Sequence, residues 1–489
     1  MFNRLKLSVA ALALVAAPAL AANDSVIIGI ALEPPTLDPT SGAAAAIREV
    51  TQVNIYEGLT RFGPDGSILP ALAKSWDIEE NGKVWIFHLN EGVKFHDGSD
   101  FDAEDVKFTL ERTTAEGSTN AQKQLFNGIE TVEVVDAKTV KITLKAPDAN
   151  FAFNMAWGDA VMMAPESVAD NATKPVGTGP YKLGEWVKGD RIDLVANPDY
   201  WGAKPAIEKA TFKIIADPTA ALNAMMAEDV DVFPIFPAPE TLAQFEGDSR
   251  FQVLKGTTEG ETILGLNNQK APLDNVKVRE AIAHAVNRQE IIDGAMFGLG
   301  TPIGTHFAPH HPAYVDLTAQ SAFDPEKAKA LLKEAGVENL KLRLALPPPM
   351  YARRGGEIIA AQLRNVGIET EISNLEWAQW LEQVFKGKDF DLTIISHVEP
   401  MDINIYARPD YYFGYGKPEF VAILDELAVT ADDAKRTELL QSAQKMIADD
   451  YVNVYLFQLA KAGVAKAGLK GLWPNSPAPI IDIGALSWE

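Results

Sequence analysis

The pattern of hydrophobic and polar positions changes its period within residues 262–304, near the middle of the chain. Residues 262–264 form a short, β-branched and apolar run that is typical of a strand. A polar loop with Asn267 and Asn268 follows, and apolar side chains then recur at helical spacing over residues 278–286. A strand that leads through a polar loop into a new helix predicts a crossing between two lobes.

Strand-like and helix-like stretches alternate beyond this crossing. We expect strands at residues 341–345, 369–373 and 390–395, and helices at residues 325–335, 355–366 and 377–385. This alternation predicts a mostly parallel α/β lobe that binds its ligand at the loop ends of the strands.

The N-terminal half has its clearest pattern between residues 72 and 112. Asn81-Gly82 predicts a hairpin turn before the alternating run 84–89, and residues 102–105 predict the capped start of a helix. This segment resembles the signature of the extracellular solute-binding proteins of the peptide/nickel class, family 5, which are receptors of ATP-driven importers. Further stretches that resemble the family's motifs follow in the family's order, at residues 175–181, 197–202, 278–282 and 323–328.

The resemblance implies an α/β periplasmic-binding-protein fold of type II, with two lobes joined by a hinge and an extra subdomain. It implies that lobe I comprises residues 22–266 and 462–489, with the inserted subdomain at about residues 62–174. Lobe II would comprise residues 267–461. A solute would close such lobes by contacting both, because only a higher affinity for the closed form can shift the population.

Length and composition agree with more than one lobe. Single hydrophobic cores stop growing at roughly 250 to 300 residues, and this chain has 489. Its hydrophobic fraction of 47% and charged fraction of 23% are typical of globular proteins. The absence of cysteine excludes disulfides and a lipid-anchored cysteine.

The N-terminus has the pattern of a cleavable secretory signal. Arg4 and Lys6 precede an apolar run over residues 7–18, and residues 19–21 read Ala-Leu-Ala. The apolar run is shorter than the about 20 residues that a transmembrane helix needs. We therefore predict that residues 1–21 are a signal peptide and that the mature protein is periplasmic.

Charge and motifs argue against several classes of function. The formal net charge of −23 disfavours nucleic acid and anionic membranes as partners. The sequence has no nucleophile elbow, phosphate loop, zinc motif or dinucleotide fingerprint, and Gly-Thr-Gly-Pro at residues 177–180 predicts a structural turn. The seven histidines show no metal-ligand spacing. We predict a protein that is not an enzyme, with no catalytic residue, no metal and no cofactor.

Arg353 and Arg354 are the candidates for binding a carboxylate. Two guanidinium groups in a loop before a helix can form paired, charge-assisted hydrogen bonds. The loop resembles that of the dipeptide-binding branch, in which an arginine holds the ligand's carboxylate and an aspartate on a later loop holds its free amine. Ser396 stands where that aspartate is expected, so Glu399 and Asp402 are the acidic candidates and recognition of a free amine stays open.

Other ligand-binding candidates lie in loops at the expected cleft or at the end of an apolar strand. Several are aromatic, because aromatic side chains give a large contact area at little entropic cost. They are Glu33, Asn267, Asn268, Tyr351, Trp377, Trp380, His397 and Tyr411.

A short peptide or an amino-acid conjugate is the expected solute. Metal chelates, glutathione-like compounds, opines and oligosaccharides are the alternatives that the family implies. The expected protein partners are the transmembrane subunits of an ABC permease, and the protein itself is expected to be a monomer. A periplasmic hydrolase or a chaperone on the same fold is the alternative function.

Overall fold

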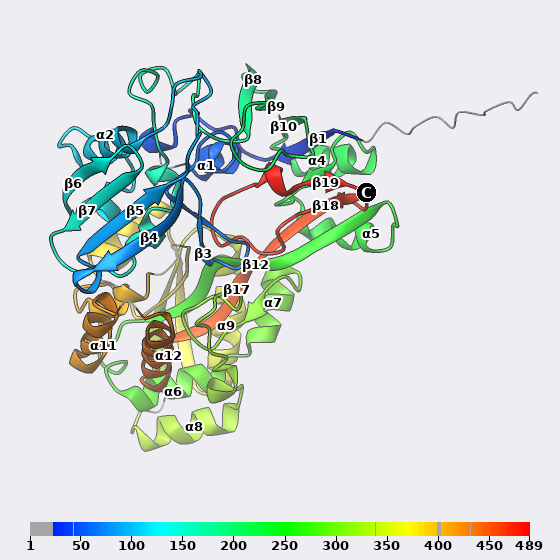
Figure 1. Ribbon diagram of the computed structural model, residues 1–489. Helices are drawn as coiled ribbons and strands as arrows, with labels where there is room; N and C mark the ends of the chain where they lie inside the picture. The colour runs from blue at the N-terminus through cyan, green and yellow to red at the C-terminus, as the bar shows by residue number, and fades with distance from the viewer. Residues whose placement is uncertain (1–22, 43, 338, 399–401, 431) are drawn as a thin grey trace, which may run out of the picture.

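The computed structural model describes residues 23–489 except 43, 338, 399–401 and 431, and does not describe the side chains of Gln124, Trp377 and Ala378. The described chain forms two lobes and a smaller subdomain, with two long strands running between the lobes (Figure 1). Among the described residues, no helix is long and apolar enough to cross a membrane.

One mixed sheet of eleven strands extends through both lobes. Its order is β15 (Ile368–Asn374), β14 (Leu340–Leu346), β16 (Leu392–His397), β12 (Phe251–Leu266), β17 (Asn453–Lys466), β11 (Val232–Phe233), β1 (Ser25–Ile30), β10 (Lys209–Ile214), β9 (Arg191–Ala196) and β8 (Tyr181–Val187), with β13 (Thr301–Pro302) beside β17. The sequence predicted a mostly parallel second lobe, and this is wrong. β14 is parallel to β15 and β16, whereas β12 is antiparallel to β16 and β17.

The two long strands β12 and β17 carry the chain from one lobe to the other. They pair from Phe251 opposite Lys466 to Gly265 opposite Asn453. The pairing is irregular between Thr257 and Glu261. We call residues 257–261 of β12 and the facing 458–460 of β17 the crossing segment. The predicted strand at residues 262–264 is thus the second half of a longer strand.

Helices cover the second lobe's sheet. They are α6 (Val276–Ala285), α7 (Arg288–Met296), α8 (Pro325–Glu334), α9 (Met350–Asn365), α10 (Trp377–Trp380), α11 (Pro418–Ala428) and α12 (Asp433–Asp449), and a π-helical turn over Leu381–Lys386 extends α10. The helix predicted after the polar loop is divided in two. Asn275 caps α6, and Asn287 caps α7.

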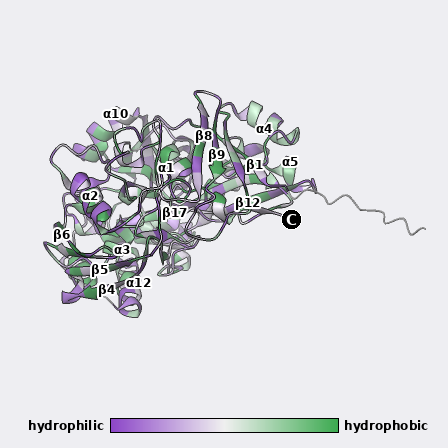
Figure 2. Ribbon diagram, turned by 45° about the horizontal axis from the view of Figure 1, so that its top comes forward, coloured by the Kyte–Doolittle hydropathy of each residue, from purple (hydrophilic) through white to green (hydrophobic). Residues whose placement is uncertain are grey.

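The subdomain is a separate four-stranded sheet with its own core. Its order is β4 (Ala73–Glu79), β5 (Val84–Leu89), β7 (Thr139–Leu144) and β6 (Ile129–Asp136). Trp85, Phe87 and Phe151 pack in its core with α2 (Ala103–Thr114), which shows both hydrophobic and hydrophilic turns in Figure 2. The hairpin predicted at Asn81-Gly82 joins β4 to β5 and is confirmed.

The remaining elements are short and belong to the first lobe and its junction with the subdomain. They are α1 (Ala45–Thr51), β2 (Thr60–Phe62), β3 (Ile68–Pro70), α3 (Phe151–Asn154), α4 (Pro218–Met226), α5 (Ala243–Glu246), β18 (Leu469–Lys470) and β19 (Ser487–Trp488).

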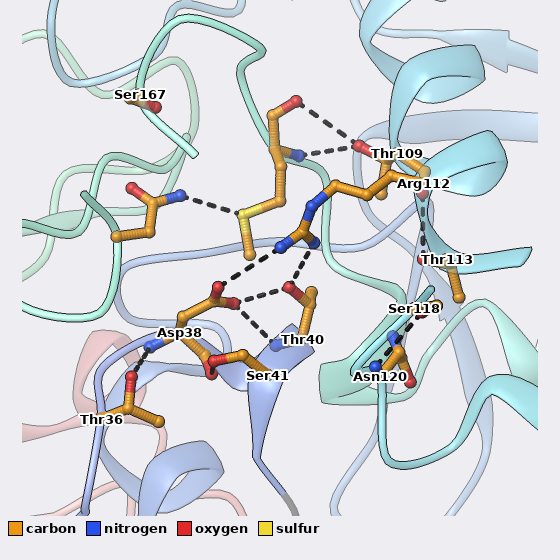
Figure 3. Close-up of polar contacts among 12 residues, drawn as sticks. Thr36, Asp38, Thr40, Ser41, Thr109, Arg112, Thr113, Ser118, Asn120 and Ser167 are labelled. Atoms are coloured by element: carbon orange, nitrogen blue, oxygen red, sulfur yellow. Dashed lines mark hydrogen bonds and ion pairs between the residues drawn. The ribbon is translucent and has the colours of Figure 1, made fainter. Parts of the chain in front are cut away.

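Arg112 of α2 ties the subdomain to the loop that follows β1 (Figure 3). Its guanidinium donates to Thr40 Oγ1 at 2.7 Å and lies 3.7 Å from Asp38 Oδ2. The other Asp38 oxygen accepts from the backbone N–H and the hydroxyl of Thr40. The subdomain thereby holds the loop between β1 and α1 in place.

The loop at residues 175–181 packs directly against the end of α1. A Cβ added to Gly177 would lie 2.0 Å from the carbonyl oxygen of Ile55, so only glycine allows this approach. Glu57 accepts hydrogen bonds there from Thr178 Oγ1, Tyr200 Oη and Trp201 Nε1 at 2.8 to 2.9 Å. Two motifs that are separate in the sequence, residues 175–181 and 197–202, therefore meet at Glu57 in the folded protein.

His96 joins the same junction through both ring nitrogens. Its Nδ1 accepts from the N–H of Gly177 at 3.3 Å, and its Nε2 lies 2.9 Å from the carbonyl oxygen of Gly179, to which it donates. Burial lowers the pKa of His96 to about 4, although the hydrogen bond to Gly179 opposes this shift. The neutral ring is therefore the form that fits the fold.

We predict that His96 makes the protein less stable in acid. Its pKa is about 4 in the folded protein and about 6.5 in an unfolded chain. Between these values the unfolded chain binds the additional proton, so the free energy of unfolding falls as the pH drops from 6.5 to 4. Urea unfolding at several pH values should show a shallower acid loss in His96→Gln than in the wild type.

His88→Gln is the control, since the His88 side chain is partly exposed and its Nε2 lies 2.8 Å from Asp77 Oδ2 at the subdomain surface. An acid loss of equal slope in His96→Gln and the wild type would contradict the assignment.

Candidate functional site

A hollow of about 430 Å³ lies at the edge of the first lobe's sheet, beside the crossing segment. It opens where β1 and β11 end. The strands β1, β10 and β11 are parallel, so their carboxyl ends lie on the same side of the sheet. Ligands of open α/β sheets bind outside the carboxyl ends of the strands. The hollow is lined by residues 29–33, 44–46, 49, 234, 235, 237, 461, 476 and 479–481.

Leu32 and Ile235 are the most exposed apolar groups of this wall. These residues are 71% and 55% exposed, so they offer apolar surface at the mouth of the hollow. The candidate Glu33 lies beside them, but its Oε1 accepts from Trp186 Nε1 at 2.9 Å and from Gly189 N at 3.0 Å. Glu33 therefore lines the hollow while its carboxylate is held by the β8–β9 hairpin.

Two opposite charges border the same hollow. Lys461 of β17 is 5% exposed, and burial lowers its pKa to about 8 against the opposing effect of Glu49. Burial likewise raises the pKa of Glu49, and Lys461 partly offsets this shift. Sequence analysis missed both residues, because each stands in an ordinary helical or strand pattern and only the fold brings them together.

A second hollow, of about 490 Å³, lies between the subdomain and α12. Trp76 and Phe153 line one side, and Arg436 and Leu440 of α12 line the other. It does not reach the ends of β1 or β11 within the described residues, so we regard the first hollow as the better site for a solute.

The second lobe presents the ends of β14 and β16 on its side of the crossing segment. Tyr351 lies there, and its hydroxyl accepts from the backbone N–H of Ser396 at 3.3 Å. His397 is buried, with Nε2 3.1 Å from the Tyr412 hydroxyl. Burial lowers the pKa of His397 to about 4, while Asp402 raises it and His306 lowers it further. His397 is thus a neutral, packed group.

Glu261, His306 and Asp402 form a buried polar cluster next to His397. His306 Nδ1 lies 3.1 Å from Glu261 Oε1, and Nε2 lies 2.5 Å from Asp402 Oδ1. One ligand atom from each residue falls within 4.8 Å of the others, a spacing that could hold a metal ion. Sequence analysis predicted no metal site, because these residues stand far apart in the chain.

The predicted pair of arginines does not converge on one point. Arg353 Nη2 donates to Glu376 Oε1 at 3.0 Å, and the guanidinium carbon of Arg354 lies 5.3 Å from the centroid of the Phe297 ring. The sequence predicted that both arginines lie in a loop before a helix, and this is wrong. Both belong to the first turns of α9.

Several other candidates lie inside the second lobe. Trp380 is 4% exposed in the lobe's core and donates from Nε1 to Thr393 Oγ1 at 2.9 Å. Asn267 donates from Nδ2 to the carbonyl oxygens of Lys388 and Phe390, and Asn268 donates to those of Leu266 and Val452. These asparagines therefore close a loop at the far end of β12, away from the crossing segment.

Of the last three candidates, the structure describes the side chain of Tyr411 alone. Tyr411 lies 9% exposed against the rings of Tyr412 and His397. Glu399 and the side chain of Trp377 lie outside the described residues.

Comparisons with known proteins agree with one another. The family model described as bacterial extracellular solute-binding proteins, family 5 Middle, matches residues 67–414. The dipeptide-binding protein of Escherichia coli (strain K12) is 30% identical over 85% of this chain and 86% of its own length. The nickel-binding periplasmic protein of the same organism is also 30% identical, over 87% of each chain. The solved structure of HbpA2 from Haemophilus parasuis superposes with a TM-score of 0.88 at 26% identity, over 95% of this chain and all of its own.

Proposed function

The chain belongs to family 5 of the bacterial extracellular solute-binding proteins and serves as the solute-binding component of an ABC importer; we propose that its solute is a short peptide or an amino-acid conjugate held between the two lobes. The predicted two-lobed fold is confirmed by the solved structures of relatives. The observation that carries the ligand proposal is the hollow at the carboxyl ends of β1 and β11.

The geometry supports capture by closure. The hollow lies in the first lobe, and Tyr351 and His397 lie at the strand ends of the second. Between them the lobes share the crossing segment, whose irregular pairing is the natural place for a rotation. A solute that touches both walls favours the closed form, because only differential affinity shifts the population.

The finer features of the protein are proposals as well. We propose that residues 1–21 are removed on export to the periplasm, that the mature protein acts as a monomer and that it catalyses no reaction. The lobe boundaries after residue 266 and before residue 462 also stay predictions. Sequencing the N-terminus of protein recovered from the periplasm tests the cleavage site directly.

We predict that protein purified gently from its own periplasm carries one bound solute of defined mass. Native mass spectrometry should detect it at a ratio of one per chain, and small-angle scattering should show a smaller radius of gyration than after the solute is removed. Adding the solute back should restore the compact form and recover the same mass.

A solute that returns as cleaved products would favour the hydrolase alternative. A protein that is always empty and never contracts would favour the chaperone. A bound metal complex would favour a metal chelate, for which the cluster of Glu261, His306 and Asp402 offers ligand atoms.

A further inference from the structure

Lys461 is a buried cation whose hydrogen-bonding capacity is only partly used. Its Nζ donates to the carbonyl oxygens of Trp473 at 2.9 Å and Asn475 at 3.2 Å. An ammonium group has three N–H donors, so one remains. Among the described residues, no carboxylate makes an ion pair with this ammonium, since its two contacts are both neutral carbonyls.

Glu49 does not neutralise Lys461. The two influence each other's pKa through space, but they form no ion pair within 4.0 Å in the described part of the chain. A buried charge without a counter-charge is costly unless something else supplies one. An anion that enters the hollow would supply it.

Apart from Glu33, Glu49 and Ser476, the remaining wall of the hollow is apolar. Its volume of about 430 Å³ lies within the range of roughly 300 to 1,000 Å³ that small-molecule sites occupy. Aliphatic and proline residues line the hollow together with Lys461, chiefly Ile30, Leu32, Pro234, Ile235, Ile480 and Ile481. Such a wall suits an apolar body with one charged end.

We infer that this hollow binds the anionic end of an amphipathic solute, a carboxylate attached to an apolar group, and that Lys461 selects the charge. The inference rests on the proposed function and gives the chemical class of its solute. It assigns the anion to the first lobe rather than to Arg353, which is paired with Glu376, or to Arg354, which stacks on Phe297.

The carbonyl groups that hold Lys461 come from the C-terminal segment at residues 473–475. That segment is fixed on β12, because Thr257 N donates to Asn475 Oδ1 at 3.0 Å and Ser476 N donates to the Thr257 carbonyl oxygen at 2.8 Å. The ammonium is thus held by a segment that is itself anchored on β12, which favours a selective contact over a loosely placed surface charge.

Two matched fluorescent probes test the inference on the intact protein. 8-Anilinonaphthalene-1-sulfonate has an apolar aromatic body with an anionic group, and N-phenyl-1-naphthylamine has a similar body without charge. We expect the wild type to bind one sulfonate probe per chain. Lys461→Met should weaken that binding about tenfold or more and leave the uncharged probe within about twofold, because a charge-assisted contact is lost while the apolar wall stays. Lys461→Arg should keep most of the affinity for the sulfonate.

Lys470→Met is the matched control, since Lys470 is exposed and pairs with Glu489 at the surface. It should leave both probes unchanged. Competition in the wild type gives a test without any variant: 1-naphthoate should displace the sulfonate probe at about tenfold lower concentration than 1-naphthamide.

The inference is overturned if the wild type binds neither probe, if Lys461→Met loses both probes equally, or if naphthoate and naphthamide compete equally well. None of these results would affect the proposed function, which depends on the recovered solute and on closure.

Discussion

Replacing Glu57 by leucine should destabilise the protein by roughly 3 to 6 kcal/mol, because three hydrogen-bond donors lose the buried carboxylate that is their common acceptor. The hydroxyls of Thr178 and Tyr200 and the indole N–H of Trp201 all donate to this carboxylate. Leucine fills much of the space but accepts no hydrogen bond. Urea unfolding monitored by tryptophan fluorescence measures the loss, and Glu130→Leu on the exposed face of β6 should change stability by no more than about 0.5 kcal/mol.

The pH dependence of the same variant gives a second readout. Burial raises the pKa of Glu57 to about 7, and the three hydrogen bonds only partly offset this shift. The folded protein therefore keeps a proton up to about pH 7 that an unfolded chain releases near pH 4.5. Stability falls as the pH rises through this window in the wild type, and this contribution should vanish in Glu57→Leu. Equal stability of the two proteins at pH 5 and pH 8 would contradict the role given to Glu57.

Replacing Gly256 by alanine should detach the C-terminal segment at residues 473–475 from β12. An alanine Cβ would lie 1.9 Å from the carbonyl oxygen of Pro474, which belongs to the backbone and cannot turn aside. We expect a loss of about 3 kcal/mol, the upper part of the usual range for overpacking. Hydrogen exchange measured by mass spectrometry should rise over residues 472–481 while the second lobe keeps its protection.

Gly128→Ala is the control for this variant, since nothing lies within 4 Å of a Cβ at that position. Unchanged exchange over residues 472–481 in Gly256→Ala would show that the segment adapts to the added methyl group.

The elements that were predicted well have signals within a few residues of one another. Asn81-Gly82 forms its turn because both residues adopt the left-handed conformation that a tight hairpin needs. Asp102 caps α2 by accepting from the N–H of Glu104, and Asp105 accepts in turn from the N–H of Asp102, so all three groups are neighbours in sequence. Local chemistry decides such features, so the sequence alone reveals them.

The middle of β12 could not be predicted in this way. Residues 257–261 read Thr-Thr-Glu-Gly-Glu, which carries no strand signal, yet the strand continues through them because β17 pairs with β12 on either side, up to Thr257 and again from Glu261. Tertiary pairing outweighs intrinsic preference here. The same holds for Asn267, whose side-chain amide donates to the carbonyl oxygens of Lys388 and Phe390 in a distant loop.

The same distinction between local and distant signals applies to the residues of the candidate site. Glu33 was found because a strand that enters a proline-rich loop is a local pattern, and it does line the hollow. Lys461 was missed because its partners Trp473, Asn475 and Glu49 come from distant segments. The arginine pair was chosen for its charge and spacing, but Glu376, just before α10, already pairs with Arg353, and Phe297, just after α7, lies under Arg354.

The position of β17 constrains the order in which the molecule can assemble. This strand lies between β12 and β11 and begins at Asn453, so the last tenth of the chain completes the sheet of both lobes. Until β17 pairs, β12 lacks one of its two neighbouring strands, and the strands of the first lobe are not joined to those of the second. Pairing between segments so far apart in sequence is slow, because a large loop must be closed before the contacts form. The chain must therefore stay unaggregated until its final strand is available, and a truncation before Asn453 would leave both lobes incomplete.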